Sequence, residues 1–162
     1  MQQVLIRNIE KQDNPIIAKI IRTTLEEFNA NHPGTVYFDA STDALYELFQ
    51  TDKSNYQVAL LNGELVGGGG IFPTAGLPPD TCELVKMYLH QNARGTGIGK
   101  ILIEKAIASA KAMGFKKIYL ETMPELKLAL NIYAKFGFTY LTAPMGNSGH
   151  GGCTLWMMKN IE

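Results

Sequence analysis

Residues 83–100, ELVKMYLHQNARGTGIGK, contain the signal that decides the fold. The first half is rich in Leu, Val, Met and Tyr, which favours a buried strand. In the second half Gly95, Gly97 and Gly99 occupy alternate positions, and an apolar pattern of helical period follows as far as Met113. A strand, a glycine-rich turn and a helix in this order form an anion site, because the first helical amides lack partners and the helix dipole adds positive charge. We therefore expect a phosphate group to bind here.

The spacing of these glycines distinguishes between families of phosphate-binding loops. A Walker A loop needs its first glycine where Arg94 stands. The dinucleotide-binding fingerprint needs its third glycine where Lys100 stands, although Glu121 lies near the place of its acid. What remains is Arg-x-x-Gly-x-Gly, formed by Arg94, Gly97 and Gly99. This motif resembles the acetyl-coenzyme A motif of the GNAT superfamily of N-acetyltransferases; the alternative is an ordinary strand-to-helix turn.

Length and composition indicate one globular domain. The 162 residues are a natural size for a single domain, which we assign to residues 1–162. Fifteen basic and fifteen acidic side chains give no net charge, so we expect no nucleic-acid and no membrane partner. The two cysteines, Cys82 and Cys153, are expected to be reduced thiols. With no signal peptide and no membrane-spanning apolar run expected, the sequence predicts a cytoplasmic protein.

Hydrophobic periodicity predicts an alternation of strands and helices. We expect strands over residues 4–9, 57–61, 65–71, 82–90, 117–122, 138–143 and 153–159, and helices over residues 14–28, 41–50, 98–113 and 124–136. Asn14 is the expected N-cap of the first helix, and Ser41 or Thr42 that of the second. Asn62-Gly63 predicts a tight hairpin. The four glycines at 67–70 predict a bulge or a close approach of backbone or ligand, the alternative being a merely flexible strand.

The predicted order is β-α-α-β-β-β-α-β-α-β-β, an α/β fold (α+β mixed sheet). The helix between residues 82–90 and 117–122 makes these two central strands parallel. This order is similar to the GNAT fold from end to end, and a second motif supports the resemblance. Ala129, Tyr133, Gly137 and Phe138 match the family's Ala-x-x-x-Tyr-x-x-x-Gly-Phe helix end. The resemblance implies an acetyl-CoA-dependent N-acetyltransferase that transfers the acetyl group directly to an amine.

Direct transfer needs a base and an acid. An alkylammonium has a pKa of roughly 10.4, so its proton must be removed, and a thiolate leaves more easily when an acid protonates it. Tyr133, the tyrosine of the family helix motif, is the candidate acid; the alternative is a tyrosine that only shapes the pocket. Glu83 stands as far before Arg94 as the catalytic glutamate of histone-acetylating members, and this resemblance makes it the candidate base, acting directly or through a water. The alternative is a carboxylate paired with Lys86 or Lys117.

The resemblance also implies where the coenzyme binds. Backbone groups of Met87, Tyr88 and Leu89 should pair with the pantetheine arm like an added strand. The loop amides should hold the pyrophosphate, assisted by the charges at both ends of the loop. The loop residues are Arg94, Gly95, Thr96, Gly97, Ile98, Gly99 and Lys100.

The chain departs from the family in the helix that carries Tyr133. Many members place an asparagine seven residues before that tyrosine to bond the pantetheine, and here the position is Leu126. Asn131 lies nearby in the sequence and is the candidate that replaces it.

Two loops are expected to form the acceptor pocket by resemblance, residues 31–39 and 146–153. Tyr37 and His150 are the candidate substrate residues, although polar loop side chains are more often only solvated. The neutral charge favours a small-molecule primary amine as acceptor. An acyl-CoA-binding sensor or non-catalytic subunit, and a protein or peptide N-acetyltransferase, are the alternatives. No metal is expected, and the apolar residues 155–158 would allow a homodimer.

Overall fold

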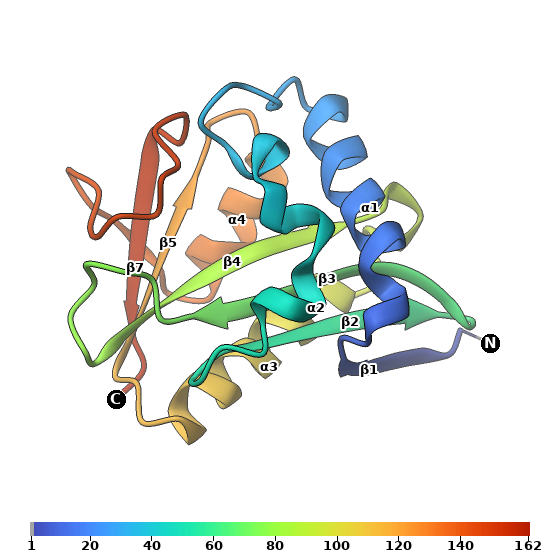
Figure 1. The fold of residues 1–162 in the computed structure, drawn as a ribbon, viewed down its shortest axis with the longest axis horizontal. Helices are drawn as coiled ribbons and strands as arrows, with labels where there is room; N and C mark the ends of the chain where they lie inside the picture. Colours follow the sequence, from blue (N-terminus) through green and yellow to red (C-terminus); the bar gives the residue numbers. More distant parts are fainter. Residues whose placement is uncertain (1) are drawn as a thin grey trace.

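The computed structural model describes residues 2–162, which form one seven-stranded sheet with helices on both faces (Figure 1). The strands are β1 (Val4–Asn8), β2 (Asn55–Leu61), β3 (Glu64–Phe72), β4 (Thr81–Leu89), β5 (Lys117–Thr122), β6 (Thr139–Tyr140) and β7 (Leu155–Asn160). The helices are α1 (Asn14–Glu27), α2 (Leu45–Leu48), α3 (Ile98–Ala112) and α4 (Lys127–Lys135), with 3-10 turns at Lys11–Asp13, Val36–Phe38, Ala40–Asp43 and Gln91–Ala93. The strand order is β1-β2-β3-β4-β5-β7-β6.

The sheet is mixed, as the sequence predicts. β4 and β5 run parallel, and each other pair of neighbouring strands is antiparallel. The apolar stripe of α1, with Ile17, Ile21 and Leu25, packs with α2 against one face. α3 and α4 cover the opposite face through residues such as Ile103 and Tyr133. The predicted element order and the helices on both faces are therefore confirmed.

The starts of two helices differ from the prediction. Asp13, not Asn14, occupies the N-cap position of α1. The Asn14 side chain instead accepts a hydrogen bond from the amide of Tyr46 at 2.9 Å and donates one to Glu47 at 2.6 Å, so it joins α1 to α2. The second helix is only four residues long, because Ala40–Asp43 forms a 3-10 turn and the N-cap of α2 is Ala44. The buried Thr42 lies in that turn and donates its hydroxyl to the carbonyl of Val36.

The C-terminal elements are also shorter than predicted. The fourth helix begins at Lys127, because the amide of Leu126 closes a turn on the carbonyl of Met123 at 3.1 Å. β6 contains two residues instead of six, and β7 begins at Leu155, after Cys153. Loop geometry replaces regular pairing where glycines are frequent, between residues 146 and 152.

The run of four glycines lies in β3 where backbone atoms approach closely. A Cβ on Gly67 would lie 2.3 Å from the carbonyl oxygen of Tyr88, and one on Gly70 would lie 2.4 Å from that of Asn55. The register between β3 and β4 also shifts between Gly68 and Gly70. The predicted bulge and close approach are both present, which excludes the merely flexible strand.

Candidate active site

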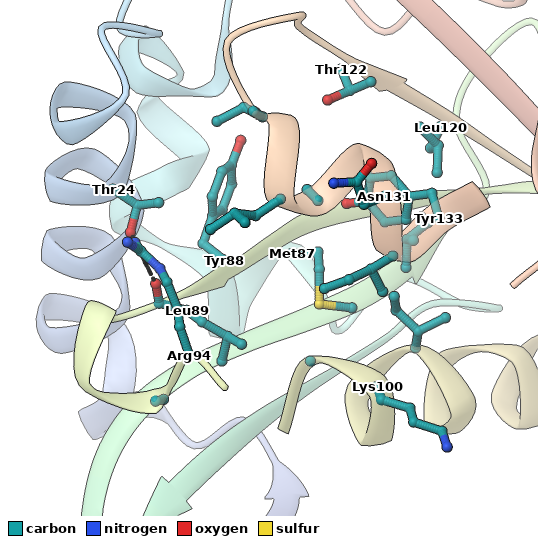
Figure 2. A pocket seen from close by; sticks show the side chains of 18 of the residues that line it. Thr24, Met87, Tyr88, Leu89, Arg94, Lys100, Leu120, Thr122, Asn131 and Tyr133 are labelled. Atoms are coloured by element: carbon teal, nitrogen blue, oxygen red, sulfur yellow. Dashed lines mark hydrogen bonds between the residues drawn. The ribbon is translucent and has the colours of Figure 1, made fainter. Parts of the chain in front are cut away.

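The site begins where β4 and β5 separate. The two strands pair only over Thr81–Glu83 and Lys117–Tyr119, so the edge of β4 beyond Glu83 has no strand partner on the β5 side within the described residues. A cavity of about 440 Å³ lies there, lined by parts of α1, β4, β5, α3 and α4 (Figure 2). Met87, Tyr88 and Leu89 line this cavity. An extended ligand can therefore pair with an open strand edge.

The glycine-rich loop forms one end of the cavity. Gly95 and Gly97 have φ angles of 78° and 85°, which favour glycine, and Gly97 is the N-cap residue of α3. No amide from Gly95 to Lys100 donates a hydrogen bond of normal geometry within the described residues. Thr96 turns its hydroxyl back to the carbonyl of Ala93, which fixes the turn. The loop thus presents unpaired amides at a helix N-terminus, the arrangement that binds phosphate.

The charges at the two ends of this loop are arranged differently. Arg94 donates through both terminal nitrogens to the Glu27 carboxylate on α1 and also to the carbonyl of Leu89 at 3.1 Å. Its guanidinium lies 4.9 Å from the centre of the Phe28 ring. Arg94 therefore joins the loop to α1, whereas Lys100 is exposed on α3 at the border of the cavity.

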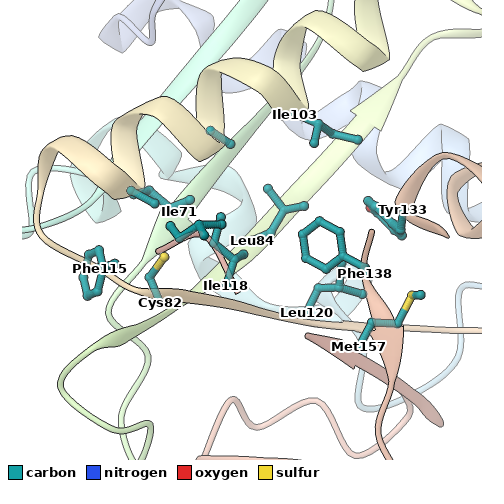
Figure 3. Packing of buried hydrophobic residues seen from close by; sticks show 13 residues of the cluster. Ile71, Cys82, Leu84, Ile103, Phe115, Ile118, Leu120, Tyr133, Phe138 and Met157 are labelled. Carbon is teal, nitrogen blue, oxygen red and sulfur yellow. The ribbon is translucent and has the colours of Figure 1, made fainter. Parts of the chain in front are cut away.

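Tyr133 and Asn131 lie on α4 beside the cavity (Figure 2). Tyr133 is 7% exposed, and its ring packs 5.9 Å from that of Phe138 at the edge of the buried cluster under the sheet (Figure 3). Its hydroxyl makes no hydrogen bond to the described residues, and because none of their fully buried side-chain nitrogens and oxygens lacks a partner, this hydroxyl is open to the cavity. Burial raises the pKa of Tyr133 well above the usual value, so the phenol keeps its proton at neutral pH. Leu126, at the start of α4, also lines the cavity, and Asn131 supplies a polar side chain further along the same helix.

Glu83 lies behind the cavity and does not line it. Its side chain is buried, and Thr74 donates a hydrogen bond to Oε1 at 2.6 Å. Burial raises the pKa of Glu83 to about 7, and the nearby Glu121 adds to the shift. The carboxyl therefore has the proton affinity of a base that works near neutrality, and it needs a water to reach the cavity.

A polar cluster surrounds Glu83 on the α1 face of the sheet. Glu121 on β5 lines the cavity and accepts hydrogen bonds from Ser148 and from Tyr119, the latter at 2.6 Å. His150 lies between Glu121 and Asp39, with its Nε2 atom 2.6 Å from Asp39 Oδ2 and its Nδ1 atom 3.9 Å from Glu121 Oε1. Burial acts to raise the pKa of Asp39, but the contacts with His150 and Lys86 outweigh it and hold that pKa below the usual value.

The two candidate substrate residues have different surroundings. His150 is part of the cluster beside the cavity. Tyr37 donates its hydroxyl to Glu26 on α1 at 2.8 Å and does not line the cavity. Sequence reasoning did not single out Lys86 and Glu121 as site residues. The available signal was the presence of charged residues, Glu83, Lys86 and Glu121, inside otherwise apolar central strands.

Glu83, Glu121 and His150 also have ligand atoms within 4.8 Å of one another. Two carboxylates and an imidazole at this spacing can bind a divalent cation. The hydrogen bonds from Thr74, Ser148 and Tyr119 already use one oxygen of Glu83 and both oxygens of Glu121. That no metal takes part stays a prediction.

Comparison with known proteins agrees with this geometry. The model of the Acetyltransferase (GNAT) family matches residues 19–138. This chain belongs to the GNAT family of acetyltransferases. The uncharacterized N-acetyltransferase YjgM of Escherichia coli K12 is 38% identical to this GNAT protein over 161 residues, 99% of this chain and 96% of that one. The protein is therefore an acyltransferase, as the resemblance implied.

Solved structures share the GNAT fold of this chain. An acetyltransferase of the GNAT family from Staphylococcus aureus Mu50 matches with a TM-score of 0.87 at 19% identity, over 99% of this chain and 100% of that one. The acetyltransferase yncA of Salmonella typhimurium, solved with its cofactor acetyl-CoA, matches with a TM-score of 0.75 at 22% identity, over 99% of this chain and 95% of that one. Among residues 2–162, no helix has both the length and the apolar character needed to cross a membrane.

Proposed function

We propose that this GNAT protein transfers the acetyl group of acetyl-CoA to a primary amine of a small molecule. The observation that carries the proposal is the continuity of three features. Unpaired loop amides open onto a cavity, the cavity follows the free edge of β4, and it ends beside the hydroxyl of Tyr133. These features suit a diphosphate, an extended pantetheine arm and a thioester in that order. The name and the bound cofactor of yncA support the same co-substrate.

The residues fit acetyl-CoA by chemistry as well as by shape. Amides of the glycine-rich loop take the diphosphate oxygens, and the dipole of α3 adds favourable charge. The free edge of β4 offers main-chain donors and acceptors to the amide groups of the pantetheine arm. When bound, acetyl-CoA supplies the activated acyl group as a thioester.

Residues of the chain provide the proton transfers. Glu83, through a water, removes a proton from the acceptor ammonium and releases it to solvent, which leaves a nucleophilic amine. The amine nitrogen forms a bond to the carbonyl carbon as the carbon–sulfur bond breaks, and it gives up its second proton to solvent to become the amide nitrogen. Tyr133 gives its proton to the departing sulfur and regains one from solvent. General acid and base groups of this kind contribute about 10²- to 10⁴-fold each.

The test measures thiol release and product together. The protein is incubated with acetyl-CoA and a panel of small amines, amino acids and peptides, and the acetylated product is identified by mass spectrometry. Acetylation of a small amine above the acceptor-free rate supports the proposal. Tight CoA binding without turnover of any acceptor indicates the sensor instead, and turnover of peptides alone indicates a protein N-acetyltransferase.

A further inference from the structure

Lys86 has an unusual backbone conformation at the centre of β4. It is the extra residue of the bulge, since Gly68 pairs with Tyr88 and Gly70 pairs with Val85. Its φ angle is 54°, in the left-handed region that a side chain other than glycine rarely adopts. Such a conformation costs free energy and is concentrated at functional sites. The bulge turns the lysine side chain to a position that regular alternation along β4 would not give.

The side chain of Lys86 is almost fully buried, and its ammonium group lies at the cavity with unused donors. The side chain is 5% exposed and lines the cavity. Its Nζ atom makes no hydrogen bond within the described residues, and the nearest carboxylate oxygen, Asp39 Oδ2, is 3.7 Å away. That oxygen already contacts His150 Nε2 at 2.6 Å. An ammonium has three donors, and no fully buried side-chain nitrogen or oxygen among the described residues lacks a partner, so this Nζ atom is open to the cavity, where a ligand can replace water.

The surroundings of Lys86 contain charges of both signs. Asp39 and His150 link Lys86 to Glu121, which lines the same part of the cavity, and Glu83 lies behind them. Burial lowers the pKa of Lys86, and the charges of Asp39 and Glu83 oppose that shift. The carboxylates suit an ammonium group, whereas Lys86 suits an anion. A single acceptor molecule that carries both an ammonium group and an anionic group would match the whole cluster.

We propose that the acceptor is an amine with a carboxylate on the neighbouring carbon, as in an α-amino acid, and that Lys86 binds this carboxylate. The inference rests on the proposed acetyl transfer and specifies its substrate class. The carboxylate supplies the acceptor atoms that the Lys86 ammonium lacks, in a partly dry site where a charge-assisted hydrogen bond is strong. The amino group of the same molecule is then directed to the side of Glu121 and Glu83, next to Tyr133.

A purely structural role for Lys86 makes a different prediction. If Lys86 only balances the charges of Asp39 and Glu83, the enzyme has no reason to prefer an acceptor with a carboxylate. Loss of the lysine would then change the rates of all acceptors by similar factors. The ratio between matched acceptors therefore separates a binding role from a structural one.

The experiment compares amino acids with their decarboxylated amines. L-leucine with isopentylamine and L-phenylalanine with phenethylamine form two such pairs, extended to the other standard amino acids, and kcat and KM are measured for each. We expect kcat/KM to be about ten- to hundredfold higher for the amino acid, the range of a hydrogen bond to a charged group. In Lys86→Met this preference should fall toward one, mainly through a higher KM for the amino acid.

Controls make the outcome decisive. Lys105→Met removes an exposed lysine of α3 that makes no ion pair within the described residues, and it should keep the preference. Thermal stabilisation by CoA checks that each variant is folded. If Lys86→Met does not fold, Lys86→Asn replaces it, because asparagine tolerates a positive φ.

The contradicting results are distinct. A preference that survives in Lys86→Met, or acetylation of simple amines without amino acids, overturns the inference and leaves the acetyl transfer intact. If CoA stabilises the protein but neither amino acids nor simple amines are acetylated, the proposed acetyl transfer is wrong, and this substrate class is wrong with it.

Discussion

At the scale of single residues, Tyr133 is a buried phenol whose hydroxyl has no partner within the described residues. We expect Tyr133→Phe to lower kcat for acetyl transfer about 10²-fold or more, because the departing thiolate then lacks its acid. Stability and CoA affinity should change little, since no hydrogen bond within the protein is lost. Steady-state thiol release measures the rate, and calorimetric titration with CoA measures the affinity. An unchanged kcat would reduce Tyr133 to a residue that shapes the pocket.

Glu83 makes the reaction depend on pH. Because burial raises the pKa of Glu83 to about 7, the carboxylate form that accepts a proton increases as pH rises through that value. We expect kcat/KM to rise with pH with an apparent pKa near 7. In Glu83→Gln this dependence should disappear, with the rate lowered about 10²-fold or more. An unaltered pH profile in the variant would assign the base to another group.

The same carboxyl links stability to pH. The pKa of Glu83 is raised from 4.5 to about 7 in the folded protein, so the folded state binds its proton more tightly than the unfolded chain does. The free energy of unfolding should therefore fall as pH rises between these values. Glu83→Gln removes that loss, so its melting temperature relative to wild type should increase from about pH 5 to about pH 8. Glu64→Gln, which removes an exposed carboxylate from β3, should show no such trend.

At the scale of elements, the main prediction concerns the N-terminus of α3. Gly97 has a φ angle of 85°, so Gly97→Ala strains the turn that presents the loop amides. We expect weaker CoA binding, measured by titration calorimetry. Gly114→Ala at the other end of α3 is the matched control, since Gly114 has a φ angle of 88° and both positions leave space for a Cβ. Both variants should lose similar stability, and equal CoA affinities in the two would contradict a role for the loop.

Elements were predictable where local patterns determine them. The apolar periodicity of α3 and the Asn62-Gly63 hairpin, with φ angles of 52° and 84°, were predicted from the sequence. The lengths of α2 and β6 were not predicted: a 3-10 turn at Ala40–Asp43 precedes α2, and β6 pairs with β7 only at Thr139 and Tyr140. The bulge was predicted in the glycines of β3, but the residue that bulges, Lys86, lies on the neighbouring strand.

At the scale of the whole molecule, the fold brings together residues that no local pattern connects. His150 and Asp39 are 111 residues apart and meet beside Glu121. The coenzyme site could be proposed from the sequence because one contiguous stretch, residues 83–100, contains the strand edge and the loop that line one part of the cavity. For the acceptor the sequence offered only two loops by resemblance, and it could not predict which of their side chains meet, because those loops lie far apart along the chain. The cytoplasmic location, the homodimer and the absence of a metal stay predictions of the sequence.

The central claim is that the loop from Gly95 to Lys100 holds a diphosphate, and the thermal stability of the protein tests it most directly. A ligand that binds only the folded state at about 100 times its Kd adds about 2.7 kcal/mol, which raises Tm by roughly 5 to 10 °C for a chain of this size. We predict such a shift with saturating CoA and a much smaller one with pantetheine, which lacks the diphosphate. No shift with CoA, or an equal shift with pantetheine, would contradict the claim.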